Sequence, residues 1–353
     1  MSLLEYMAKS YLADQAGKKP IQPRDPSKSL IAVGFGANIR LYNLYEETYS
    51  DLLVEPLPKP KKKKKPAATA IGAMAQSYDF AFTGSYPLKI QFDPTGRYLA
   101  VLQSNGSLYI WDVATQSQLP IICPEIPRGF NFSPDGNRFI FRGEAAYHIF
   151  DVPSFAEWKT ITLNGLGDDL YDLPYRFPFL LTDSAQAVIL GHSHLHALNL
   201  ATGISQSRVM VPTSISNWLV RSASGDLLYA NNGTIRRFSQ EYGLLAGCDR
   251  DMATFEANPA WDLFCYVCSD TGRMYIMDSQ TFETEFQIPE SSGFSYPKFS
   301  ADGYHLLYYS ENSNEIHIRD IRNPSCQIVG IIPLPFTPSC AFDLQPQLAF
   351  PTT

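Results

Sequence analysis

Three histidines within six residues are the strongest candidate for metal chemistry in this sequence. They lie at His192, His194 and His196, in the run GHSHLH. Alternate residues of a strand project from one face, so imidazoles at this spacing could approach a common metal ion. However, His192 is expected in a turn and His196 well inside the following strand, which separates them by ~13 Å if the chain is extended. We therefore expect turn formation and core packing, and keep a metal site as the alternative.

Cys265 and Cys268 form a Cys-x-x-Cys pair. On a strand, residues three apart point to opposite faces, which disfavours a shared zinc ion or a redox couple. The six cysteines of the chain are scattered among strand-like segments: Cys123, Cys248, Cys265, Cys268, Cys326 and Cys340. Because this is not a dense disulfide framework, we expect reduced core cysteines in a cytoplasmic or nuclear protein.

Carboxylates gather at Asp168, Asp169, Asp172 and Asp183. They could meet a cation or a basic partner, but solvated loop carboxylates explain them more simply. The chain has no glycine-rich phosphate loop before a helix, no G-x-S-x-G and no H-E-x-x-H. We therefore assign no catalytic residue and no cofactor. An enzyme with dispersed loop residues remains the alternative, since fold alone does not decide function.

Six lysines lie within seven positions, at Lys59, Lys61, Lys62, Lys63, Lys64 and Lys65. Like charges and prolines predict that the surrounding segment, 57–84, is disordered. It could be a solubilising spacer, a nuclear-localisation signal in a eukaryote, or a contact to nucleic acid, acidic protein or anionic lipid. The net charge of −7 becomes −13 without these lysines, so the rest of the chain is a poor candidate for direct nucleic-acid binding.

The elements that position these residues are predicted from the stretch Leu88–Asp112, LKIQFDPTGRYLAVLQSNGSLYIWD. Two strands flank the turn Asp-Pro-Thr-Gly, and Asn105-Gly106 supplies the positive φ angles of a tight hairpin into a third strand. A weaker fourth strand follows at Gln118–Ile122. Four short antiparallel strands in about 40 residues are typical of one β-propeller blade.

This pattern recurs along the chain. First strands are expected to begin near positions 88, 128, 176, 216, 253 and 296, a period near 40 that is typical of a propeller and not of a solenoid or sandwich. A first unit, with strands at Leu30–Phe35, Asn38–Leu44 and Asp51–Glu55, lacks its leading strand. Pro338–Leu344 can supply it and close the ring, because an open array would leave two sheet edges unpaired. We predict an all-β, seven-bladed β-propeller, with six or eight blades as alternatives.

The ends of the chain are predicted to lie outside the propeller. Residues 1–26 are expected to form a helix, with apolar residues on one face of Ser2–Gln15, and then a proline-broken linker. The helix could pack on the propeller or dock on a partner or membrane surface. The propeller is assigned to 27–346 and a tail to 347–353. No apolar run of ~18 residues and no secretory leader is present, so we expect a soluble chain that is not secreted.

Over roughly residues 27–346 the chain resembles the WD-repeat β-propeller family. The resemblance rests on Trp111-Asp112 and on three turns of the type FDPTG at 92–96, 132–136 and 299–303. Related strand endings occur at Phe150-Asp151, Met277-Asp278 and Arg319-Asp320. Only one true Trp-Asp strand ending is present, and the Gly-His pair that opens regular repeats is missing. The Asp-His-Ser-Trp network typical of the family is therefore expected to be absent from most blades.

The resemblance implies a function as well as a fold. In the resembled family, the face built from loops between blades is the usual partner surface, and the lysine-rich insertion falls in such a loop. We expect a non-catalytic protein–protein interaction scaffold, a rigid platform within a larger complex, whose partners are other proteins. The lysine-rich loop could add a weak polyanion contact. The alternative is a propeller enzyme, or a protein that binds a small ligand or metal in its central channel.

Overall fold

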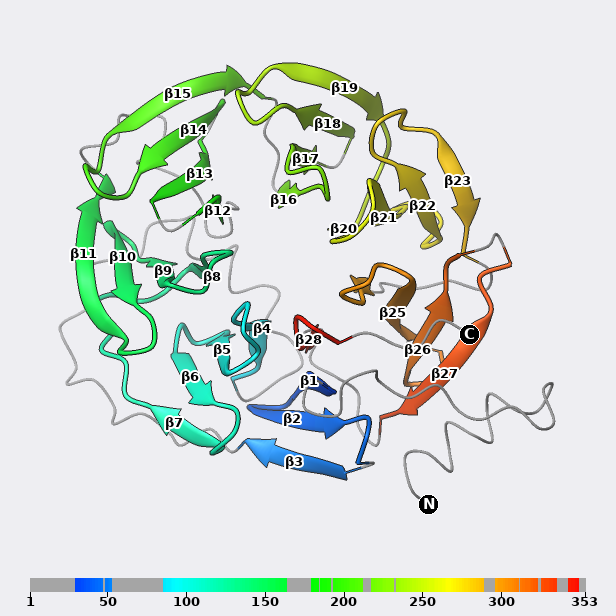
Figure 1. The fold of residues 1–353 in the computed structure, drawn as a ribbon, viewed down its shortest axis with the longest axis horizontal. Coiled ribbons are helices and arrows are strands. Elements are labelled where there is room, and N and C mark those ends of the chain that lie inside the picture. The colour runs from blue at the N-terminus through cyan, green and yellow to red at the C-terminus, as the bar shows by residue number, and fades with distance from the viewer. Residues whose placement is uncertain are drawn as a thin grey trace, which may run out of the picture.

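A computed structural model describes twelve stretches of the chain. They are residues 29–46, 48–52, 85–163, 179–183, 185–191, 193–211, 217–231, 233–288, 296–310, 312–322, 325–334 and 342–348. These residues form seven four-stranded antiparallel sheets around a central axis, which confirms the seven-bladed propeller (Figure 1). The expected N-terminal helix, its linker and the lysine-rich segment 57–84 lie outside the described residues. No helix in the described part could cross a membrane.

The blades follow one another along the chain, and each begins at the axis. Blade 1 contains β28 (Phe342–Leu344), β1 (Leu30–Phe35), β2 (Asn38–Asn43) and β3 (Thr48–Leu52). Blade 2 contains β4 (Pro87–Phe92), β5 (Tyr98–Gln103), β6 (Leu108–Asp112) and β7 (Ser117–Leu119). Blade 3 contains β8 (Gly129–Phe132), β9 (Arg138–Arg142), β10 (Ala146–Asp151) and β11 (Ala156–Thr162).

Blades 4 to 7 repeat this order. Blade 4 contains β12 (Phe179–Leu181), β13 (Gln186–Leu190), β14 (His194–Asn199) and β15 (Ser205–Met210). Blade 5 contains β16 (Asn217–Arg221), β17 (Leu227–Asn231), β18 (Thr234–Phe238) and β19 (Leu244–Asp249). Blade 6 contains β20 (Thr254–Ala257), β21 (Leu263–Val267), β22 (Met274–Asp278) and β23 (Thr284–Gln287). Blade 7 contains β24 (Lys298–Phe299), β25 (His305–Ser310), β26 (Glu315–Asp320) and β27 (Ile328–Pro333).

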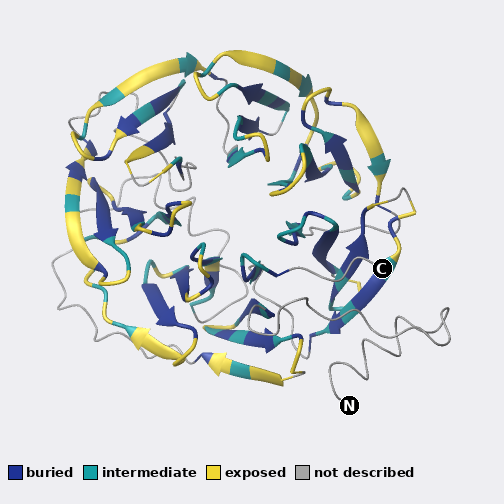
Figure 2. Cartoon of the chain, viewed as in Figure 1, coloured by how far each residue is buried: buried dark blue, intermediate teal, exposed yellow. Residues whose placement is uncertain are grey.

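Burial follows the position of each strand in its blade. The middle strands have neighbours on both faces, so β5 and β6 are buried at every residue and are apolar up to their last residues, Gln103 and Asp112. By contrast, no residue of the outer strand β19 is buried, and most are exposed. Figure 2 shows mostly buried middle strands, strands of mixed burial nearest the axis, and an outer rim that is mostly exposed except at β27.

The core is divided into seven apolar clusters, one between each pair of neighbouring blades. Trp111, from the one Trp-Asp strand ending, lies in the cluster between blades 1 and 2 at 2% exposure. A buried side chain of this size contributes about 3–5 kcal/mol relative to alanine. Each blade is therefore stabilised from both sides, and the described residues form no apolar cluster within a single blade.

The turn motif of the sequence begins with a buried polar residue in blades 2, 3 and 7. Asp93 accepts a hydrogen bond from the Tyr98 amide at 2.6 Å. The hydroxyls of Ser133 and Ser300 accept from the amides of Arg138 and His305, at 2.8 and 3.1 Å. Because all three side chains are fully buried, these bonds satisfy backbone donors that water cannot reach. This explains the recurrence of Asp or Ser before each Gly turn.

The two ends of the propeller meet in blade 1. β28 pairs antiparallel with β1, with Phe342 opposite Val33 and Leu344 opposite Ile31, which confirms the predicted closure. The first part of the predicted strand, 338–341, lies outside the described residues. Residues 345–348 continue as a clasp on both neighbours, where the Gln345 amide group donates to Gly96 O at 3.2 Å and the Ala301 amide donates to Leu348 O at 2.8 Å. Gln347 also donates to Pro94 O.

Truncation after Leu334 should unfold or oligomerise the protein, because it removes both β28 and the clasp and exposes the inner edge of β1. Size-exclusion chromatography with light scattering and thermal unfolding measure the effect. Truncation after Leu348 is the matched control, since it leaves every contact of the clasp in place. A monomer with unchanged melting temperature after the longer truncation would contradict this account of closure.

Candidate functional site

Antiparallel blades give the propeller two chemically different faces. The turns between the first and second strands and between the third and fourth strands lie at one end of every blade, which we name the turn face. The other end, the loop face, carries the connections between blades. Five of these connections, 53–84, 164–178, 212–216, 289–295 and 335–341, fall outside the described residues. They include Lys59, Lys61 to Lys65, and the carboxylates Asp168, Asp169 and Asp172.

The histidine candidates lie on β14. His194 begins this strand and His196 follows on the same face, with ring centroids 6.2 Å apart, while His192 lies outside the described residues. The Ser193 hydroxyl lies 2.7 Å from Nδ1 of His194, and His196 is 5% exposed. In the described stretches, no group of three or more His, Cys, Asp or Glu side chains could hold a metal ion.

The two residues of the Cys-x-x-Cys pair face different blades. Cys265 packs in the cluster between blades 6 and 7, whereas Cys268 packs against the cluster between blades 5 and 6. All five described cysteines have free thiols, and Cys340 lies outside the described residues. Burial raises the pKa of the Cys123 and Cys326 thiols to about 12, so these cysteines are protonated and poorly nucleophilic at neutral pH.

A charged network that sequence analysis missed lies on the inner strands around the propeller axis, and we name it the channel network. The inner strands β20, β24 and β28 bring together Glu256, Lys298 and Asp343, one from each strand. Nζ of Lys298 lies 3.3 Å from Oε1 of Glu256 and 3.7 Å from Oδ1 of Asp343, so one ammonium joins blades 6, 7 and 1. The Phe92 amide of blade 2 donates to Oδ2 of Asp343 at 2.8 Å. Burial raises the pKa of both carboxyl groups, against the pull of Lys298.

Lys89 extends this network to blade 3. Its Nζ donates to Phe130 O at 2.6 Å and to Oδ1 of Asn131 at 3.0 Å. Burial, and then repulsion from Lys298, lower the pKa of Lys89 to about 7. A neutral amine still supplies the two N–H donors that these bonds need. The channel network therefore runs over five consecutive blades, from 6 through 7, 1 and 2 to 3, and includes an amine that titrates near neutrality.

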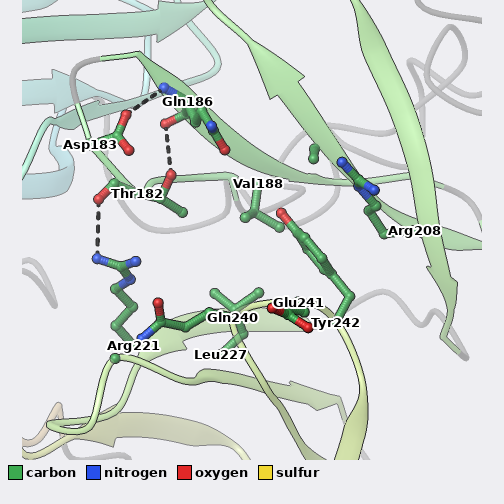
Figure 3. Close-up of a pocket in the computed structure, with 12 residues that line it drawn as sticks. Thr182, Asp183, Gln186, Val188, Arg208, Arg221, Leu227, Gln240, Glu241 and Tyr242 are labelled. Carbon is green, nitrogen blue, oxygen red and sulfur yellow. Dashed lines mark hydrogen bonds between the residues drawn. The ribbon is translucent and has the colours of Figure 1, made fainter.

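A second polar site lies at the turn face, between blades 4 and 5. This pocket has a volume of about 360 Å³, and its lining includes Thr182, Asp183, Arg208, Arg221 and Tyr242 (Figure 3). Nη1 of Arg221 donates to Thr182 O at 3.1 Å, a bond that crosses the interface between the two blades. Asp183 is the one described member of the predicted acidic group. Its Oδ1 accepts the amides of Ala185 and Gln186 at 2.7 Å each, so it caps its own turn.

Comparison with known proteins supports the fold. No family model matches the chain, and no curated protein matches it. Among solved structures, the chain is similar to the β-propeller domain of Cps50 (Swd1) from Myceliophteria thermophila, with 13% identity and a TM-score of 0.57 over 74% of this chain and 90% of that one. It is also similar to a chain in the structure of the mitotic checkpoint complex, with 14% identity and a TM-score of 0.59 over 80% and 81%.

These likenesses define a class of protein by its fold. The chain is a seven-bladed β-propeller, and its resemblance to WD-repeat propellers is confirmed at the level of the fold. The charged channel network and the arginine-lined pocket are features of this chain's own residues.

The channel network predicts a pH dependence of stability that Lys89→Met should remove. The pKa of Lys89 is lowered in the folded state, so between about pH 7 and 10.5 the unfolded state binds more protons. Wild-type stability should therefore rise with pH relative to the variant over this range, by on the order of 1 kcal/mol per pH unit. Chemical unfolding of both proteins at several pH values measures the difference.

Lys298→Met is the matched control in the same channel. Glu256 and Asp343 raise the pKa of Lys298 despite its burial, so this lysine is charged in both states below about pH 10. Its removal should lower stability throughout the range but leave most of the Lys89 trend, because burial, the larger cause of the lowered Lys89 pKa, is unchanged. If stability depends on pH in the same way in wild type and Lys89→Met, the lowered pKa of Lys89 is contradicted.

Proposed function

We propose that this propeller is a non-catalytic protein–protein interaction scaffold, a rigid platform within a larger complex. The observation that carries this proposal is the closed ring, in which seven inter-blade clusters and the clasp hold every blade from both sides. A rigid surface binds a partner with little cost in ordering, so affinity depends on the contacts alone. One similar chain comes from a structure of the mitotic checkpoint complex, which supports an assembly role by analogy of fold.

The proposed partners are other proteins that dock on the faces built from turns and loops. The outer strands of blades 2, 3 and 6 are less suitable, because their exposed side chains are mainly polar. The channel network supports a structural role for the inner strands, since Lys298 pairs with both Glu256 and Asp343 and so joins three blades. We place the protein, as part of this proposal, in the cytoplasm or nucleus.

One observation favours a second candidate, a small anionic ligand in the central channel. Lys89 lies on the inner strand β4 without a carboxylate partner within 4 Å among the described residues. A ligand that supplied one would hold this lysine in its charged form. Native mass spectrometry of the purified chain distinguishes the candidates, because a channel ligand would add a small, defined mass.

Affinity purification of the full chain from its native source, with cross-linking and mass spectrometry, tests the scaffold proposal. We expect stoichiometric protein partners whose cross-links cluster on one face of the propeller and spare the outer strands. A chain that remains alone at native concentration, or that carries only a small molecule, would overturn the proposal.

The lysine-rich loop is proposed as a weak polyanion contact above an otherwise acidic body. Replacing Lys59 and Lys61–Lys65 by glutamine should leave the melting temperature unchanged but sharply reduce binding to heparin, and the residual binding should lose most of its salt dependence. In a eukaryotic cell, nuclear accumulation should fall as well. A much lower melting temperature would mean that the lysines pack on the body. If none of these measurements changes, the loop is a solubilising spacer.

A further inference from the structure

The pocket between blades 4 and 5 contains a residue that differs from its counterparts in blades 3 and 6. The turn between third and fourth strands holds a residue with positive φ in several blades: Gln116, Phe155, Tyr242, Phe282 and Cys326. In blades 3 and 6 this residue is a buried phenylalanine that packs into the cluster shared with the preceding blade. Blade 5 has Tyr242 there, against the cluster of blades 4 and 5. The same backbone position thus carries an added hydroxyl, at the wall of the pocket.

The turn around Tyr242 is held in place before any ligand binds. The Tyr242 amide donates to Ser239 O at 2.9 Å, and the Ser239 amide donates to Gly243 O at 2.8 Å. The Gly243 amide also donates to the Ser239 hydroxyl at 3.0 Å. A φ of +68° is uncommon for a residue with a side chain and persists where the surroundings determine it. The backbone at Tyr242 is therefore fixed by the turn, and the ring packs against the cluster between blades 4 and 5.

Three donor groups line this pocket with unused capacity. Among the described residues, the Tyr242 hydroxyl has no hydrogen-bond partner, and Arg208 has neither a hydrogen bond nor an ion pair. The guanidinium of Arg208 lies 5.6 Å from the centre of the Tyr242 ring. Arg221 donates from Nη1 to Thr182 O, but its buried Nε has no partner. Figure 3 shows Arg221 and Arg208 on opposite sides of the pocket, with the tip of Tyr242 directed between them.

The charges around the tyrosine hydroxyl are predominantly positive. Burial raises the pKa of Tyr242, and Arg208 and Arg221 both oppose that rise, so the two guanidiniums act on the same point. The lining also includes the carboxylates Asp183 and Glu241. Asp183 turns Oδ1 toward two amides of its own turn, and Glu241 lies exposed at the neighbouring turn. The lining thus holds two arginines and two carboxylates, and the arginines are the charged groups that act on the Tyr242 hydroxyl.

We propose that this pocket binds the carboxylate of an aspartate or glutamate side chain on a partner protein. A carboxylate is an acceptor-only group whose oxygens can receive several N–H and O–H donors, including bidentate donation from an arginine. The pocket volume of about 360 Å³ accommodates such a side chain with part of its backbone. Arg208 and Arg221 supply the charge, and Tyr242 supplies an oriented hydroxyl. This inference rests on the scaffold function proposed above and names the chemistry of one docking site.

Selection from a library of random short peptides on the immobilised full chain tests the proposal. We expect enriched peptides to share an aspartate or glutamate at one position. Changing that residue to the matching amide should weaken the measured Kd by about tenfold or more.

Three variants define the site with these peptides. Arg208→Ala should weaken binding by about tenfold, without a change in melting temperature because Arg208 is exposed. Tyr242→Phe should weaken peptide binding by a few-fold. This variant should fold normally, since phenylalanine occupies the same position in blades 3 and 6. Arg236→Ala is the matched control, because Arg236 pairs with Asp249 in the same blade and does not line this pocket.

Three results would overturn the proposal. They are an absence of enriched peptides, enrichment without an acidic position, and enriched peptides that bind Arg208→Ala and Tyr242→Phe as tightly as wild type. If a phosphoserine peptide binds far more tightly than its glutamate counterpart, the group that the pocket binds is a phosphate and not a carboxylate. If partners recovered from the native source bind Arg208→Ala unchanged, the pocket assignment fails while the scaffold function stands. If no partner is recovered, the scaffold function itself fails.

Discussion

The antiparallel pairing of β28 with β1 is the interaction on which the rest of the propeller depends. It joins residues more than three hundred positions apart, as in the hydrogen bond from the Leu30 amide to Oε1 of Gln345. Every apolar cluster lies between two blades, so without closure two blades would each expose an apolar face. The clasp at 345–348 strengthens this point by bonding to both neighbours of blade 1. The stability of each blade is thus linked to the completeness of the ring.

The charged channel network and the apolar clusters have different roles. Apolar clusters supply most of the favourable free energy of folding, because removing apolar surface from water is the main driving force of folding. A partly buried ion pair such as Lys298 with Glu256 adds little net stability, because desolvation offsets the attraction between the charges. Its value lies in selectivity: Lys298 can satisfy Glu256 and Asp343 together only when blades 6, 7 and 1 are correct neighbours. The network therefore favours one ordering of the inner strands.

Much of the fold could be predicted from the sequence, because the turns are local. FDPTG, FSPDG and FSADG mark first turns, and the period of about 40 residues follows from counting them. The channel network could not be predicted, since Lys89 and Lys298 become neighbours only through the curvature of the ring. One signal was available: each interrupts the inner strand of its blade with a charge. The pocket at Tyr242 required the structure too, although alignment of the turns at Phe155 and Phe282 with Tyr242 would have shown the added hydroxyl.

The closure in blade 1 has a consequence for synthesis on the ribosome. β1, β2 and β3 are the first of the described strands to emerge, but β28, which completes their sheet, is translated about three hundred residues later. At about 5–20 residues per second, the inner edge of β1 waits roughly 15 to 60 seconds for its partner. During that interval its buried positions Ile31, Ala32 and Val33 are open to any other strand in the cell. We therefore expect nascent chains of this protein to need protection of this strand edge until β28 has been translated.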